Sequence, residues 1–255
     1  MRRALLVAGT AILCGVAGAQ DTRPPNKIQL EYEYEEYEAD FPSWHTAGLE
    51  GSHRFGWGSL IGRVTWADRF ADSGTQYEVD AYPKLGEKRY AYLNLGLSGS
   101  DVFPDLRWGV ELYQGFSGGW EGSLGVRRLE FEDSNVLLWT GSATKYRGNW
   151  MFTLRPWYAD KPQSSSLSGA FEVRRYFETA EDWLKVTAGY GETPDDDLTL
   201  AEVVRLDSAR VRAEMQRRWG KEWLWKAALG LRNQEFRPGE RRASASVSFA
   251  VARLF

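Results

Sequence analysis

Apolar and polar residues alternate with a period of two along almost the whole chain. In IQLEYEYE, residues 28–35, Ile28, Leu30 and Tyr32 share one face and acidic residues take the other. A β-strand places successive side chains on opposite faces, whereas an amphipathic helix repeats every 3.6 residues. The pattern therefore predicts an all-β protein whose strands have one apolar and one polar face.

Fourteen segments follow this alternation, of which the one at 44–55 is the weakest. They lie at residues 28–37, 44–55, 59–70, 75–82, 89–98, 106–114, 120–131, 136–146, 150–158, 167–176, 183–190, 208–219, 223–232 and 241–255. Outer-membrane barrels made of one chain have an even number of strands, so we expect fourteen, with twelve as the alternative. No Pro-, Gly- or Ser-rich linker divides the series, which predicts one barrel domain over residues 28–255.

The connections between these segments alternate between compact turns and longer polar loops. GWG at 56–58 and GKE at 220–222 are compact, whereas the longest loop occupies residues 191–207. Short turns at one rim and longer loops at the other are typical of an antiparallel, up-and-down barrel in the bacterial outer membrane. Aromatic residues flank the turns, namely Phe55 and Trp57, Phe116 and Trp120, Tyr146 and Trp150, Phe177 and Trp183, and Trp219 and Trp223. They predict an aromatic girdle at the membrane interface.

The N-terminal residues 1–19 have the composition of a secretory signal peptide. Arg2 and Arg3 precede an apolar stretch too short to span a bilayer, and Ala17-Gly18-Ala19 forms a small-residue cleavage site. A lipoprotein signal at Cys14 is disfavoured because Leu13 stands where a small residue is needed. Cleavage after Ala19 leaves a mature chain without cysteine, which argues against disulfides and thiol chemistry. We expect residues 20–27 to form a short periplasmic segment.

Charge and hydropathy narrow the class of protein further. The chain has 32 basic and 35 acidic residues, a balance that argues against nucleic acid as a partner. No stretch of the mature chain approaches about eighteen consecutive apolar residues, so helical membrane spans are not expected. A soluble β-sandwich would also alternate, but the leader, the aromatic turns and the loop asymmetry favour an integral outer-membrane barrel. Its expected partners are outer-membrane lipids and lipopolysaccharide.

The last segment explains why the chain ends on an aromatic residue. Backbone groups in hydrocarbon must all be paired, so a membrane-spanning sheet has to join its first strand to its last. The sequence predicts this pairing between residues 28–37 and 241–255. Phe255 would then lie at the membrane interface, and it resembles the aromatic C-terminal signature by which bacterial outer-membrane proteins are recognised by the assembly machinery.

An ordered series of stretches resembles the YaiO family of outer-membrane β-barrel proteins. They are RFGWGSLIGRVTWADRF, GTQYEVDAYPKL, YAYLNLGLSGSDVFPDLRWGVELYQGFSGGWEGSLGVRRLEF, TGSATKYRGNWMFTLRPW and GAFEVRRYF. The resemblance implies a barrel in the outer membrane and no established catalytic activity. Some similar barrels follow tetratricopeptide repeats in proteins associated with polysaccharide export, but this chain has no such repeat.

The polar faces of the strands predict a charged lumen. The residues assigned to it are Glu31, Glu33, Glu35, Glu78, Asp80, Arg210, Arg212, Arg218, Lys226 and Arg232. Because the acids come from early strands and the bases from late ones, they are expected to form opposite walls and to produce a transverse field that orients polar solutes. Tyr92, Tyr113 and Trp157 are expected in the lumen as well, where they would stack on sugar rings.

Three functions are compatible with this pattern. The first is a passive channel for polar or saccharide solutes, because a barrel of fourteen strands has a wider interior than a barrel of eight strands, which side chains fill. A link to polysaccharide export is an extension of this function. The alternative is a plugged structural or surface-binding barrel in which the charges pair and fill the interior. A lipid-modifying enzyme is the most distant of the three.

Neither catalysis nor cofactor binding is expected. Ser52 and His53 point to opposite faces of one strand, and Ser43 and His45 share a face without an acid marked by the sequence. The row of Glu31, Glu33 and Glu35 and the loop sequence PDDD at 194–197 contain carboxylates, but solvated rows explain them better than a metal site. The expected protein is not an enzyme and has no cofactor or metal.

Overall fold

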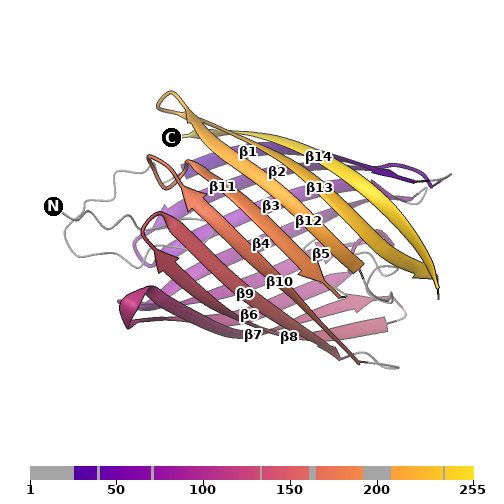
Figure 1. Cartoon of the computed structure of the whole chain (residues 1–255), viewed down its shortest axis with the longest axis horizontal. Helices are drawn as coiled ribbons and strands as arrows, with labels where there is room; N and C mark the ends of the chain where they lie inside the picture. Colours follow the sequence, from indigo (N-terminus) through magenta and orange to yellow (C-terminus); the bar gives the residue numbers. More distant parts are fainter. Residues whose placement is uncertain are drawn as a thin grey trace.

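Fourteen antiparallel strands close into a single barrel in the computed structural model (Figure 1). The structure describes residues 26–38, 41–69, 72–132, 134–160, 165–191, 208–237 and 239–255. The predicted signal peptide, residues 20–25 and the loop segment 192–207 with its PDDD sequence lie outside these residues. Each strand pairs with its neighbours in sequence, and the predicted up-and-down topology is confirmed.

The predicted count of fourteen strands is confirmed, and the alternative of twelve is wrong. The strands are β1 (Asn26–Tyr37), β2 (Trp44–Phe55), β3 (Gly58–Arg69), β4 (Asp72–Gly86), β5 (Arg89–Ser98), β6 (Leu106–Phe116), β7 (Trp120–Phe131), β8 (Ser134–Arg147), β9 (Trp150–Asp160), β10 (Ser165–Tyr176), β11 (Trp183–Tyr190), β12 (Ser208–Trp219), β13 (Trp223–Arg237) and β14 (Glu240–Leu254). A 3₁₀ turn, η1 (Ser117–Gly119), joins β6 to β7. No helix in the described ranges is long and apolar enough to cross a bilayer.

The barrel closes by pairing of β1 with β14. Their register runs from Lys27 opposite Leu254 to Tyr37 opposite Ser244. At the end of the ladder the Asn26 and Phe255 backbones exchange two hydrogen bonds, each 3.2 Å long. This pairing starts the barrel at Asn26, two residues before the predicted boundary. The last residue of the chain therefore has its backbone bonded to the first residue of the barrel.

Apolar side chains cover the outer face of the barrel wall. Leu124 is 77% exposed, and Leu30 and Leu231 are also among the exposed large apolar residues. The immediate neighbours of Leu30 and Leu231 in sequence, such as Glu31 and Arg232, point to the inside and line the cavity. An apolar exterior around a polar interior is the arrangement that a bilayer-spanning barrel requires.

Seven of the ten residues predicted for the aromatic girdle are exposed at the turn rim, Phe177 is half-buried there, and two residues are exceptions. Exposed aromatic side chains at this rim are Phe55, Trp57, Phe116, Trp120, Trp150, Trp219, Trp223 and Phe255. Tyr146 and Trp183 instead face the interior, where both line the cavity. Trp183 is 6% exposed and packs with Met151 and Tyr176. The reason is strand parity: Leu184 takes the outward face of β11, so its neighbour Trp183 must point inward.

One connection at the loop rim folds into the barrel mouth. Val102 and Phe103, between β5 and β6, are buried against Ala67 on the inward face of β3. Ser100 occupies the space that a side chain at Gly74 on β4 would need. The β5–β6 connection therefore narrows the interior at the loop end, a feature that the alternation of the strands does not indicate.

The two faces of β3 provide a test of this orientation. Val64 is exposed on the outer face, and Thr65 lines the cavity. We expect Val64→Arg to lower the free energy of unfolding in lipid vesicles by about 2–4 kcal/mol, since it places a charge in hydrocarbon near mid-strand. Thr65→Arg, the matched control, should change it by less than about 1 kcal/mol. Equal losses in denaturant titrations of the two variants would contradict the assignment of faces.

Candidate functional site

A cavity of about 890 Å³ lies inside the barrel. Side chains from all fourteen strands line it, and at the turn rim they include Lys27, Arg54 and Leu254. Toward the loop rim the lining extends to Glu35 and Gln76. The cavity thus follows most of the barrel's length, and basic and acidic residues contribute to its described lining in similar numbers.

Nine of the ten predicted lumen charges line this cavity. They are Glu31, Glu33, Glu35, Glu78, Asp80, Arg210, Arg212, Lys226 and Arg232. The tenth, Arg218, lies at the turn rim, where its guanidinium donates to the Lys221 carbonyl at 3.3 Å. Its backbone N–H donates to Asp182 at 2.8 Å. The role of the nine residues in selecting ions or solutes stays a prediction.

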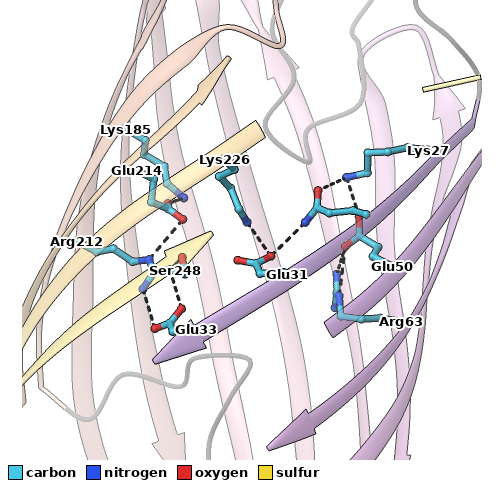
Figure 2. Close-up of polar contacts among 11 residues, drawn as sticks. Lys27, Glu31, Glu33, Glu50, Arg63, Lys185, Arg212, Glu214, Lys226 and Ser248 are labelled. Atoms are coloured by element: carbon cyan, nitrogen blue, oxygen red, sulfur yellow. Dashed lines mark hydrogen bonds and ion pairs between the residues drawn. The ribbon is translucent and has the colours of Figure 1, made fainter. Parts of the chain in front are cut away.

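The acidic and basic residues are neighbours on the wall, and the expectation of opposite walls is wrong. Only β13 and β14 separate β12 from β1 in the closed sheet. Arg212 on β12 donates to both Glu33 oxygens at 2.9 and 2.8 Å, as Figure 2 shows. Lys226 on β13 donates to Glu31 at 2.9 Å. Closure places the acidic first strand beside the basic last strands, so these acidic and basic side chains pair along the wall.

Further ion pairs extend this network around the wall (Figure 2). Glu50 on β2 contacts both Lys27 at 2.8 Å and Arg63 at 3.0 Å. Beyond Arg63, which also contacts Glu78, Arg107 on β6 reaches Glu78 at 3.2 Å. On the other side of Arg212, Lys185 on β11 contacts Glu214. The polar side chains therefore form a belt along the inner wall from β11, through the β1–β14 closure, to β6.

The ion pairs run along the wall. Each pair described here joins strands at most three positions apart, a span of roughly 14 Å at the usual strand spacing. The widest are Arg212 with Glu33 and Arg155 on β9 with Glu111 on β6, at 2.8 and 2.7 Å. Because these pairs hold their side chains against the sheet, they leave the centre of the barrel as the cavity.

Glu111 and Arg107 belong to the site, although the sequence did not single them out. Glu111 is 1% exposed and accepts hydrogen bonds from Arg155 at 2.7 Å and Ser123 at 2.5 Å. Its side chain lies where a Cβ on Gly125 would be, and Arg107 crosses Gly96 in the same way. A glycine on the inward face of a neighbouring strand is the sequence feature that could have indicated these flattened side chains.

Aromatic residues occupy another part of the lining. The predicted lumen residues Tyr92, Tyr113 and Trp157 all line the cavity. Tyr113 stacks on Tyr90 with ring centroids 4.5 Å apart, and its hydroxyl accepts from Arg155 at 3.1 Å. The buried indole N–H of Trp157 has no hydrogen-bond partner among the described residues. The lumen thus has an aromatic region on β5, β6 and β9, which adjoins the charged belt at β6.

The two histidines have surroundings that differ from a catalytic arrangement. The His45 Nδ1 atom lies 2.6 Å from the Tyr32 hydroxyl on the outer face. The His53 ring packs edge-on against Phe55 at the turn rim, 4.3 Å between centroids. Ser52, next to His53, lines the cavity. Within the described ranges, no group of three or more His, Cys, Asp or Glu side chains forms a metal-binding arrangement.

The chain is similar to known membrane barrels in sequence and in fold. The profile of the YaiO membrane beta barrel domain matches residues 25–196. No protein with a curated function matches the sequence. Similar folds occur in the CymD monoaromatic hydrocarbon channel, with a TM-score of 0.61 and 6% identity over 92% of this chain and 89% of the other. A bacterial polysaccharide outer membrane secretin gives a TM-score of 0.57 and 8% identity over 92% and 100%. For Omp33 from Acinetobacter baumannii the TM-score is 0.52, with 10% identity over 92% of this chain and 100% of the other.

The pairing across the closure can be tested with a double-mutant cycle. Glu33→Gln and Arg212→Gln each remove one side of a half-exposed, bidentate pair. We expect a coupling free energy of about 1 kcal/mol between them in vesicle unfolding titrations. The control cycle combines Glu33→Gln with Arg155→Gln and should give less than about 0.5 kcal/mol. A coupling near zero in the first cycle would show that the two residues do not pair.

Proposed function

This chain belongs to the YaiO membrane beta barrel domain family, and from that premise we propose that it is a passive outer-membrane channel for polar solutes. The observation that carries the proposal is the cavity of about 890 Å³ whose lining extends from the turn rim toward the loop rim. Charged side chains line this cavity, whereas the outer face of the barrel is apolar. A charged lining favours water inside the barrel. The ion pairs along the wall keep those side chains away from the centre.

Saccharides are the solute class that the lining supports best. A sugar ring has an apolar C–H face that stacks on aromatic rings and a rim of hydroxyls that bind polar side chains. Tyr92, Tyr113 and Trp157 provide the first kind of contact, and the charged belt provides the second. A role in polysaccharide export would extend this function. The fold is shared with a bacterial polysaccharide outer membrane secretin, which is compatible with such a role.

A plugged structural or surface-binding barrel is the second candidate. It is favoured by Val102 and Phe103, which fold into the loop-side mouth, and by the Arg242 guanidinium packed over Tyr37 at 4.4 Å. These groups narrow the lumen beyond the end of the cavity lining. The two candidates differ in one property, the passage of ions through the folded protein.

The location proposed for the protein follows from its exterior. The exposed apolar wall and the aromatic turn rim fit outer-membrane lipids, with lipopolysaccharide at the loop side. Phe255 is 52% exposed beside the closing pair of strands, a position accessible to the outer-membrane assembly machinery. Its role as an assembly signal stays a prediction.

Single-channel recording in planar bilayers tests the channel. The mature chain should give ohmic steps. Replacing Glu31, Glu33 and Glu35 by Gln should shift the reversal potential in a KCl gradient toward anion selectivity, because three lumen carboxylates lose their charge. Glu130→Gln, a control on the outward face of β7 near the loop rim, should leave the potential unchanged.

The channel would be contradicted if protein shown to be folded and inserted carries no current. A second variant then locates the block, with Gly99–Asp105 replaced by Asn-Gly, a two-residue hairpin turn. Conductance that appears only in this variant would assign closure to the β5–β6 connection. Silence in both would favour the plugged barrel.

A further inference from the structure

Two arginines on the outer face of the barrel converge on one aromatic ring at the turn rim. The guanidinium carbon of Arg175 on β10 lies 5.5 Å from the ring centroid of Phe177, and that of Arg217 on β12 lies 5.2 Å from it. Because both distances end on the same centroid, the two guanidinium carbons lie within about 11 Å of each other. Arg175 also lies 5.4 Å from the ring of Trp150 on β9. The rings therefore hold two cations close together at the edge of the lipid-facing wall.

Carboxylates of the chain do not neutralise this pair. Arg175 is exposed and forms no hydrogen bond or ion pair with the described residues, since its contacts are the two rings. The acidic contact of Arg217 within the described ranges is Asp182, 3.5 Å from Nε, and the Arg217 side chain stays 40% exposed. Glu178, the exposed residue after Phe177, forms no ion pair in the described part of the chain. A ring attracts a cation without cancelling its charge, so the pair remains positive.

The cations are confined to one arc of the turn rim. A further exposed base, Arg147 on β8, is the register partner of Trp150. On the opposite arc, Phe55 and Trp57 stack on each other, and residues 55–62 contain no basic residue. Arg253 on β14 is paired with Glu222 at 3.4 Å. The unneutralised bases therefore gather on β8–β12 and do not form a uniform ring around the barrel.

We propose that Arg175 and Arg217 bind the phosphate of an anionic phospholipid of the phosphatidylglycerol class. Compact turns lie on the periplasmic side of bacterial barrels, and aromatic rings mark the headgroup level, so this pair faces the phospholipid headgroups. Guanidinium groups suit the task because their planar forks bind phosphate oxygens in a bidentate manner. The site is on the outer face and does not depend on the proposed channel.

The wall beside the arginines favours a lipid over a free phosphate ion. β11 lies between β10 and β12 in the closed sheet. Its outward residues Leu184 and Val186 are exposed and continue from the arginine pair toward the middle of the wall. A phospholipid can place its phosphate between the arginines and an acyl chain on this apolar strip. A phosphatidylglycerol headgroup has no ammonium for the arginines to repel, whereas a zwitterionic headgroup has one.

The test measures lipid binding to the folded mature barrel in detergent micelles. Phosphatidylglycerol is titrated, the bound lipids are counted by native mass spectrometry, and phosphatidylcholine serves as the comparison lipid. Replacing both Arg175 and Arg217 by Gln should raise the Kd for the first phosphatidylglycerol at least about tenfold, because charge-assisted hydrogen bonds are lost. Each single replacement should raise it about threefold, and binding of phosphatidylcholine should not change.

The matched control replaces Arg128 and Arg253 by Gln. It removes the same number of positive charges from the outer face, but these arginines are paired with Glu130 and Glu222 at 2.8 and 3.4 Å. The control should bind phosphatidylglycerol with the wild-type Kd. The site is refuted if the Arg175 and Arg217 variants keep wild-type affinity or if the control weakens binding equally. A wild-type barrel that does not prefer phosphatidylglycerol would also overturn it, and would leave an acidic protein surface as the occupant of this arc.

Discussion

The structure depends on the closure of the sheet between β1 and β14. In hydrocarbon each unpaired backbone N–H or C=O costs several kcal/mol, so an open edge strand cannot be exposed to lipid. The register of β1 with β14 and the two hydrogen bonds between Asn26 and Phe255 remove that edge. The placement of the β1 carboxylates beside the basic residues of β12 and β13 follows from this closure.

The charges of the lumen show the effect of closure most clearly. The acidic residues of β1 are distant in sequence from the basic residues of β12 and β13, yet closure places them two or three strands apart. Glu33 with Arg212 and Glu31 with Lys226 then pair on the wall. Pairs of this kind are partly exposed to water, so each contributes little to stability. Their main consequence is geometric, since they hold long side chains flat against the sheet and leave a cavity between the walls.

Periodicity was sufficient to predict the strands and their faces. A one-residue shift would have placed Leu30 inside and Glu31 in lipid, so alternation specifies orientation strongly in a barrel. The even strand count and the loop asymmetry followed from the same pattern. Each of these features can be predicted from residues that lie close together in the sequence.

The features that the sequence did not predict are non-local. The closing pair of strands was predicted, but which charges pair depends on how far side chains reach across β12, β13 and β14, and the sequence does not give this reach. Glu111 lies over Gly125 on the next strand, a relation set by register rather than by its own segment. Trp183 was assigned to the girdle from its closeness to a turn, whereas strand parity turns it inward. The inward fold of Val102 and Phe103 depends on Ala67, which is far away in sequence.

Liposome swelling measures directly whether the lumen is a continuous aqueous path for polar solutes. Proteoliposomes containing the folded mature chain are diluted into isotonic solutions of neutral sugars of increasing size. An open lumen should give swelling that is fast for a monosaccharide and slows as the sugar grows. Swelling no faster than in protein-free liposomes, with the barrel shown to be folded and inserted, would contradict it.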